Sequence, residues 1–150
     1  MPSDPATDSA SKSPAITGRC YCGQSRLAAA SWPERLSYCH CSDCRRATGA
    51  PVAAFAAFPE GQAHWSPAGR AVSAAPGGRR WFCAGCGSPL AATFDYLPGQ
   101  VHVPLGVIDQ AAELPPQLQT HVESGLPWLH IEDDAPRHAA SGRASLQTCG

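Results

Sequence analysis

The sequence has no long apolar run and almost no lysine. Its longest apolar stretch, residues 50–58, is too short to cross a bilayer, and residues 1–14 lack the apolar run of a signal peptide. The basic side chains are ten arginines and a single lysine, and the formal net charge is -1. A nucleic-acid-binding protein normally carries a basic surplus. These absences predict a cytoplasmic protein with neither a membrane nor a nucleic acid as partner, and they leave the oligomeric state open.

Length and polarity predict one domain between two tails. A chain of 150 residues is long enough to bury a single core, and the sequence shows no internal repeat. Residues 1–14 and 139–150 are polar and are expected to be disordered. The ordered domain is therefore expected over residues 15–138.

Clustered cysteines are the strongest chemical feature of the chain. Thiols stay reduced in the cytosol, so such clusters indicate a metal or catalysis before disulfides. Cys149 lies alone in the C-terminal tail and is expected to be a free thiol. The other cysteines fall into three short motifs: Cys20-x-Cys22, Cys39-x-Cys41-x-x-Cys44 and Cys83-x-x-Cys86.

Short apolar stretches between glycine-rich and proline-rich turns predict a mainly β fold with one or two short helices. The strands are expected near residues 15–19, 24–30, 36–39, 52–58, 63–65, 70–73, 88–94, 101–105 and 117–122, and residues 79–82 lead into the Cys83–Cys86 motif. A short helix is expected to begin at Ser42, a good N-cap, and to stop at Gly49. Cys44 would lie in its first turn, where the helix dipole lowers the pKa of a thiol. A helical turn is expected near residues 108–113.

The strand period places cysteines in pairs, because residues two apart in an extended chain point the same way. Cys20 and Cys22 can therefore face one metal. Cys39 and Cys41 share a face as well, which turns His40 outward, where we expect it to be exposed. Gly23, directly after the first pair, suits a turn that needs a positive φ.

The clustered cysteines divide into a set of four and a set of three. Cys20, Cys22, Cys83 and Cys86 would make a closed structural zinc site, whereas Cys39, Cys41 and Cys44 would leave one zinc position open. Two alternatives remain. The three cysteines could be ordinary residues beside a single metal site, or a histidine could complete a structural Cys₃His site. The histidines free to do so are His64, His102, His121 and His130.

Beyond their spacing, these motifs resemble the glutathione-dependent formaldehyde-activating enzyme family, which includes centromere protein V relatives. The resemblance covers residues 17–138. It is carried by Gly18-x-Cys20-x-Cys22-Gly23, by Cys39-His40-Cys41-Ser42-Asp43-Cys44-Arg45-Arg46-x-Thr48-Gly49-Ala50-Pro51, by Arg80-x-Phe82-Cys83-x-x-Cys86-Gly87-Ser88, and by Leu126-Pro127-Trp128-Leu129 with Asp133-Asp134-x-Pro136-Arg137.

This resemblance implies a β-tent fold, in which small antiparallel sheets gather on zinc. It implies two zinc ions, a structural one on the set of four cysteines and a catalytic one on the set of three. It also implies a carbon–sulfur lyase that joins glutathione to formaldehyde, giving S-hydroxymethylglutathione. The fourth position of the catalytic zinc would then take the substrate thiol.

Side chains around Cys44 are candidates for substrate contact and proton transfer. Arg45 and Arg46 follow it and could bind the carboxylates of glutathione, because arginine suits bidentate carboxylate binding. Arg79 and Arg80 precede Cys83 and are candidates for the same role. His40 and Asp43 are candidates for moving the proton.

Two rival functions stay open. One is a non-catalytic binding module stabilised by zinc, since a fold does not fix a function. The other is an enzyme that acts on a different thiol or small electrophile.

Overall fold

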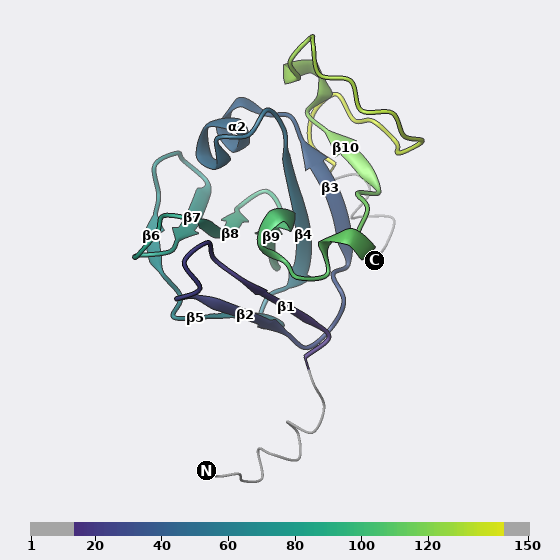
Figure 1. Ribbon diagram of the computed structural model, residues 1–150. Coiled ribbons are helices and arrows are strands. Elements are labelled where there is room, and N and C mark those ends of the chain that lie inside the picture. Colours follow the sequence, from purple (N-terminus) through teal and green to yellow (C-terminus); the bar gives the residue numbers. More distant parts are fainter. Residues whose placement is uncertain (1–13, 143–150) are drawn as a thin grey trace, which may run out of the picture.

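A computed structural model describes residues 14–142 of the chain (Figure 1). Residues 1–13 and 143–150, which include Cys149, lie outside this range, so most of the two expected tails is not described. Within the expected C-terminal tail, the carbonyl of Ala140 accepts a hydrogen bond from the backbone N–H of His121 at 2.7 Å. Within the described range, no helix has the length and apolar character needed to cross a membrane.

A three-stranded antiparallel sheet forms the first layer. It contains β1 (Ile16–Arg19), β2 (Arg26–Ala29) and β5 (Ala63–Ser66) in the order β1-β2-β5. The β1–β2 turn carries Cys20 and Cys22, and Gly23 in this turn has φ 83°. The positive φ predicted for Gly23 is therefore confirmed.

A seven-stranded sheet forms the second layer, with strand order β10-β3-β4-β9-β8-β7-β6. Its strands are β3 (Arg35–Cys39), β4 (Ala53–Pro59), β6 (Arg70–Val72), β7 (Gly78–Phe82), β8 (Pro89–Phe94), β9 (Gln100–Pro104) and β10 (Leu118–Thr120). All neighbours pair antiparallel except β10, which runs parallel to β3. The mainly β fold class is confirmed.

The two faces of the larger sheet serve different purposes. One face packs on the three-stranded sheet, and Phe58 and Val103 there are fully buried, contributing about 2 kcal/mol each in transfer free energy. This core cluster contains Ile16, Leu27, Ala29, Leu36, Ala56, Phe58, Val103, Leu105, Ile108 and Leu114. Alternate residues point to the other face, among them Cys39, Phe55 and His102. That face holds the site described below.

The α-helix α2 (Ser42–Thr48) follows β3. Its N-cap is Cys41 and not Ser42 as predicted: the sulfur of Cys41 accepts a hydrogen bond from the backbone N–H of Cys44 at 3.3 Å. Gly49 ends the helix in the left-handed region, as the sequence predicted. A 3₁₀ turn at Ala111–Glu113 lies within the helical turn expected near residues 108–113, and two further 3₁₀ turns, Leu105–Val107 and Val122–Ser124, were not predicted.

Candidate metal centres and their cavities

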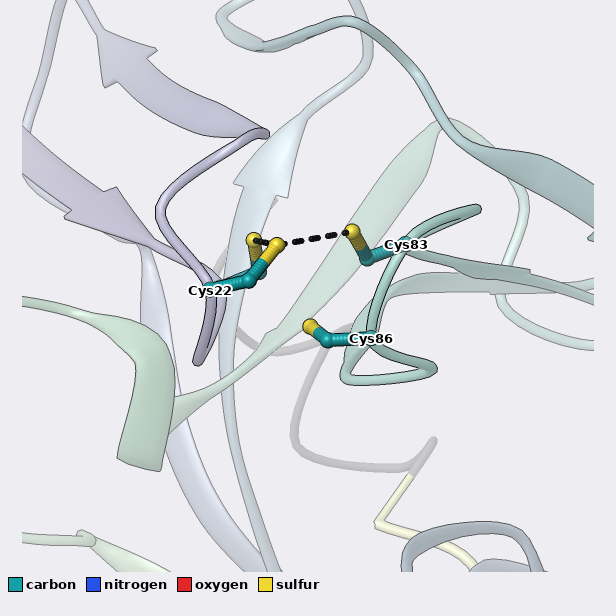
Figure 2. Close-up of side chains that lie close together, drawn as sticks. Cys22, Cys83 and Cys86 are labelled. Carbon is teal, nitrogen blue, oxygen red and sulfur yellow. Dashed lines mark hydrogen bonds between the residues drawn. The ribbon is translucent and has the colours of Figure 1, made fainter.

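Cys20, Cys22, Cys83 and Cys86, here called the four-cysteine cluster, join the two sheets. The first two lie in the β1–β2 turn and the others in the β7–β8 turn (Figure 2). All four sulfurs lie within 4.8 Å of one another. Such a set of thiols can hold one metal ion in a closed site.

Neighbouring groups hold these sulfurs in place. The backbone N–H of Ser25 donates to Cys20 Sγ at 3.3 Å, and that of Gly85 donates to Cys83 Sγ at 3.4 Å. The hydroxyl of Ser88 lies 3.1 Å from Cys86 Sγ and lowers the pKa of Cys86 to about 5. A lowered pKa favours the thiolate, the form that binds metal.

Cys39, Cys41 and Cys44, here called the three-cysteine cluster, lie where β3 passes into α2. Their sulfurs also lie within 4.8 Å of one another, and Cys39 and Cys44 are buried. The strand period aims Cys39 and Cys41 the same way, and the first turn of α2 brings Cys44 to them. The local sequence thus builds this cluster within six residues.

The close packing of the three thiols determines how many of them ionise in the absence of a cation. Hydrogen bonds from Cys39 and Cys44 lower the pKa of Cys41 to about 2. The Cys39 thiol is hydrogen-bonded to Cys41 and Cys44, and these hydrogen bonds raise the pKa of Cys39. The cluster alone therefore favours one thiolate, and a divalent cation is needed to hold three. A sulfur donor set of this kind fits zinc.

Within residues 14–142, no histidine or carboxylate joins the three-cysteine cluster as a ligand group. His64 is exposed on β5 and His130 is exposed near the C-terminal end. His102 and His121 line cavities beside the cluster. The arrangement favours an open three-cysteine site over the Cys₃His alternative.

Two cavities flank the three-cysteine cluster. The outer cavity, of about 730 Å³, is lined by Cys41 and Cys44 together with Arg46, Arg80 and His121, among others. The inner cavity, of about 50 Å³, is lined by Cys39 and Cys44 and by residues of the sheet face behind them. The two cavities share Cys44, Phe94, Tyr96 and His121.

Arg80 on β7 provides the positive charge nearest to the sulfurs among the described contacts. Its Nη2 donates to Cys44 Sγ at 3.5 Å, and its guanidinium lies 5.2 Å from the centroid of the Phe94 ring. The stacking on Phe94 fixes the guanidinium at the rim of the outer cavity. Arg80 is one of the four arginines that the sequence predicted as candidates for carboxylate binding.

The two arginines that follow Cys44 have different surroundings. Arg45 turns away from the cluster, because its Nε donates to the carbonyl of His40 and its Nη2 to that of Ser124, both at 3.3 Å. Arg46 is exposed and lines the outer cavity, as does Asp43. Of the predicted pair, only Arg46 therefore reaches the cavity beside the sulfurs.

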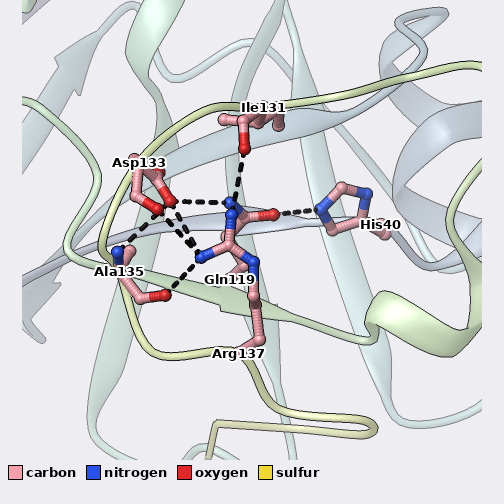
Figure 3. Close-up of polar contacts among 6 residues, drawn as sticks. All are labelled: His40, Gln119, Ile131, Asp133, Ala135 and Arg137. Carbon is pink, nitrogen blue, oxygen red and sulfur yellow. Dashed lines mark hydrogen bonds and ion pairs between the residues drawn. The ribbon is translucent and has the colours of Figure 1, made fainter.

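His40 is buried, and the expectation that it is exposed was wrong. Its Nε2 lies 2.9 Å from Gln119 Oε1, and Gln119 donates through Nε2 to Asp133 Oδ1 at 3.1 Å. Asp133 in turn pairs with Arg137 at 2.9 Å (Figure 3). The network ties the C-terminal segment to β10 and covers His40. His40 still points away from the sulfurs, as its place between two cysteines predicts.

Two residues of the site gave no local signal in the sequence. Burial lowers the pKa of His102 to about 4, and the nearby charge of Arg80 adds to this effect. Burial also raises the pKa of Tyr96 to about 12, and the neighbouring thiolates add to it. Both side chains are therefore neutral at pH 7. The pairing of β9 with β4 and β8 brings His102 to the site, and the β8–β9 turn brings Tyr96.

Comparisons with known proteins agree with this description. Residues 15–124 match the family model described as glutathione-dependent formaldehyde-activating enzyme. No curated protein matches the chain. A crystal structure of a Rhodobacter sphaeroides protein is similar, with a TM-score of 0.51 and 17% identity, covering 81% of this chain and 98% of that one. At this identity the likeness concerns the fold alone.

Proposed function

The chain belongs to the glutathione-dependent formaldehyde-activating enzyme family, and we propose that it is a zinc-dependent carbon–sulfur lyase. Its reaction would condense glutathione, or a related thiol, with formaldehyde to give S-hydroxymethylglutathione. One observation carries the proposal: three clustered thiols, with no fourth protein ligand among the described residues, open onto a cavity of about 730 Å³. Cavities of roughly 300–1,000 Å³ hold small-molecule ligands.

The two cysteine clusters take different roles in this proposal. The four-cysteine cluster would hold a structural zinc, since all four positions of a tetrahedral site are filled. The three-cysteine cluster would hold a catalytic zinc, which when bound keeps a substrate thiol in its thiolate form. The two zinc ions would serve one domain, residues 15–138, which we place in the cytoplasm.

Charged residues of the outer cavity suit a thiol that carries carboxylates. Arg80 lies at Cys44 Sγ and faces the same cavity as Arg46, while Asp43 lies on its rim. Glutathione carries two carboxylates, and a guanidinium can bind a carboxylate through two parallel hydrogen bonds. Arg80 thus becomes the first candidate for positioning the substrate, with Arg46 as the second and Arg45 held elsewhere.

The proton of the reaction has candidate carriers where the two cavities meet. His121 lies there on a left-handed backbone with φ 55°, and Tyr96 lines the same junction. A non-glycine residue held in this region is found often at functional sites. His40, in contrast, is buried in the network with Gln119, which favours a structural role for it.

The activity is tested by comparing the zinc-loaded protein with Cys41→Ser. We expect the wild-type protein to accelerate the exchange between free formaldehyde and its glutathione adduct, measured by NMR with ¹³C-formaldehyde. Loss of one metal ligand should reduce this rate by more than about 100-fold. Cys149→Ser, which removes a thiol outside both clusters, serves as the matched control and should keep the full rate. Equal rates for wild type and Cys41→Ser, both at the uncatalysed background, would contradict the proposal.

A further inference from the structure

The inner cavity is built from the functional face of the seven-stranded sheet. In the sheet register, Cys39 lies opposite Ala53, and Phe55 opposite Ser37, so these positions share one face. His102 pairs with Ala57 and Ala92 and points to the same face. The cavity therefore lies beside Cys39 and Cys44, whereas the outer cavity opens beside Cys41 and Cys44.

Two residues that line this cavity each carry a buried polar atom with no hydrogen-bond partner. His102 is 7% exposed, and its Nε2 makes no hydrogen bond. Gln100 Oε1 is likewise buried and unpartnered. Buried polar atoms in folded proteins are nearly always hydrogen-bonded, so an orphaned one needs an explanation. A bound ligand with a polar atom at this position would supply it.

The surroundings of His102 fix its charge and its orientation. Its ring lies edge-on to Phe55, with centroids 6.2 Å apart, and tilted against Phe94 at 5.3 Å. Burial lowers the pKa of His102 to about 4, which leaves a neutral ring at pH 7. A neutral imidazole carries one N–H and can polarise a carbonyl by donating a hydrogen bond.

The volume of the cavity limits what can enter. The cavity measures about 50 Å³, against roughly 150 Å³ for an apolar protein cavity that binds benzene with its six carbons. By proportion, roughly two non-hydrogen atoms fit, so an aldehyde of one carbon matches the space and one of two carbons lies at its limit. Glutathione is far too large for this space, whereas an aldehyde of one or two carbons is not.

We propose that the inner cavity is the aldehyde subsite. It takes an aldehyde of one or two carbons whose oxygen accepts a hydrogen bond from His102 Nε2. This inference rests on the proposed function, and it assigns the thiol and the aldehyde to separate cavities that meet at Cys44.

The step that His102 assists is an addition. The thiolate sulfur of the substrate, in the outer cavity, attacks the carbonyl carbon, so that a C–S bond forms and the C=O π bond breaks. The electron pair moves to oxygen, where the His102 N–H stabilises the developing negative charge. A proton from solvent, relayed by His121 or Tyr96 where the two cavities meet, gives the S-hydroxymethyl adduct, and the proton that the thiol lost leaves to solvent. His102 donates a hydrogen bond throughout and keeps its proton.

Kinetics of three variants test this role. His102→Phe keeps the shape of the ring but removes the donor, so kcat/KM for formaldehyde should fall by about 100-fold. His102→Gln returns an N–H and should recover most of that loss. Zinc content and glutathione affinity should stay unchanged in both variants, because His102 does not line the outer cavity. His64→Phe, on the exposed β5 position, is the matched control and should behave as wild type.

A binding measurement that needs no turnover separates the two proposals. Formamide is an unreactive carbonyl of three non-hydrogen atoms, and it should shift the ¹⁵Nε2 resonance of His102 saturably. It should leave the resonance of His64 in place. N,N-dimethylformamide, with five such atoms, should have no effect on His102.

The outcomes are distinct. An inactive wild-type protein in which formamide still shifts His102 would overturn the proposed function and support the small-carbonyl subsite. An active wild-type protein whose His102→Phe variant keeps full kcat/KM, or whose His102 resonance ignores formamide, would overturn the subsite and leave the function standing. An inactive protein with no formamide response would overturn both.

Discussion

The balance of charge around Cys44 governs the chemistry of the site at the scale of single residues. Three thiols share their protons so closely that Cys41 is strongly acidic while Cys39 resists ionisation. Arg80 adds a positive charge at 3.5 Å from Cys44 Sγ. Because the guanidinium is held on the Phe94 ring, this charge lies in a fixed place at the rim of the outer cavity.

Replacing Arg80 should weaken binding of glutathione. Arg80→Gln removes a charge-assisted hydrogen bond of roughly 1.5–3 kcal/mol, so the dissociation constant should rise about 10- to 100-fold. Calorimetric titration of the zinc-loaded protein measures this change. Arg45→Gln is the matched control, since the Arg45 guanidinium lies on backbone carbonyls and not in the outer cavity. The assignment would be contradicted if Arg45→Gln weakened glutathione binding while Arg80→Gln left the dissociation constant unchanged.

At the scale of elements, the three-cysteine cluster depends on the short helix α2. Cys41 caps the helix through its sulfur, and Cys44 lies in the first turn. The same sulfur that a metal would use thus accepts the N–H of a neighbouring ligand residue. At the other end, the Gly49 N–H donates to the carbonyl of Arg45 at 2.7 Å, which closes a helix of only seven residues.

Gly49→Ala should destabilise the protein by about 1 kcal/mol, because a side chain in the left-handed region costs that much relative to glycine. Gly49 has φ 72° and ψ 14°. Urea unfolding of the zinc-loaded protein measures the free energy of unfolding. Gly106→Ala is the control: Gly106 lies outside the left-handed region and an added Cβ meets nothing within 4 Å. If Gly49→Ala lowered the free energy of unfolding no more than Gly106→Ala does, the glycine cap would be dispensable.

At the scale of the whole molecule, we expect the four-cysteine cluster to stabilise the fold and the three-cysteine cluster to serve activity. The four-cysteine cluster connects the turn of the three-stranded sheet with the β7–β8 turn of the larger sheet. These segments lie far apart in the chain, as the 61-residue separation of Cys22 and Cys83 shows. The three-cysteine cluster instead joins residues of one short segment. A metal in the first cluster would therefore constrain the whole fold, and one in the second only the β3–α2 junction.

Removing a ligand from each cluster should give opposite results. Cys83→Ser should lower the melting temperature by more than about 10 °C, since structural zinc contributes directly to folding free energy. Cys41→Ser should change the melting temperature by only a few degrees but abolish activity. Calorimetry with and without a chelator measures the first effect, and chelation should lower the melting temperature of wild type as well. If Cys41→Ser destabilised the protein as much as Cys83→Ser, the division of roles would be wrong.

Local spacing accounts for what could be predicted about the site. Residues two apart on a strand face the same way, so the Cys-x-Cys pairs and the helix that follows them were predicted from the sequence. Short apolar stretches between glycine-rich and proline-rich turns likewise located most strands. The helix N-cap was missed because Cys41, which was assigned only as a ligand, also accepts a backbone N–H.

The sequence by itself determined the two sets of cysteines, the mainly β fold and the small number of helices, because these depend on neighbours within a few positions. Only the tertiary structure decided which other residues serve the site. Arg80 reaches Cys44 across 36 residues, and His102 reaches the inner cavity through the pairing of β9 with β4 and β8. His40 is buried because β10 brings Gln119 to it across 79 residues. Strand order and register set these contacts, and no local pattern encodes them.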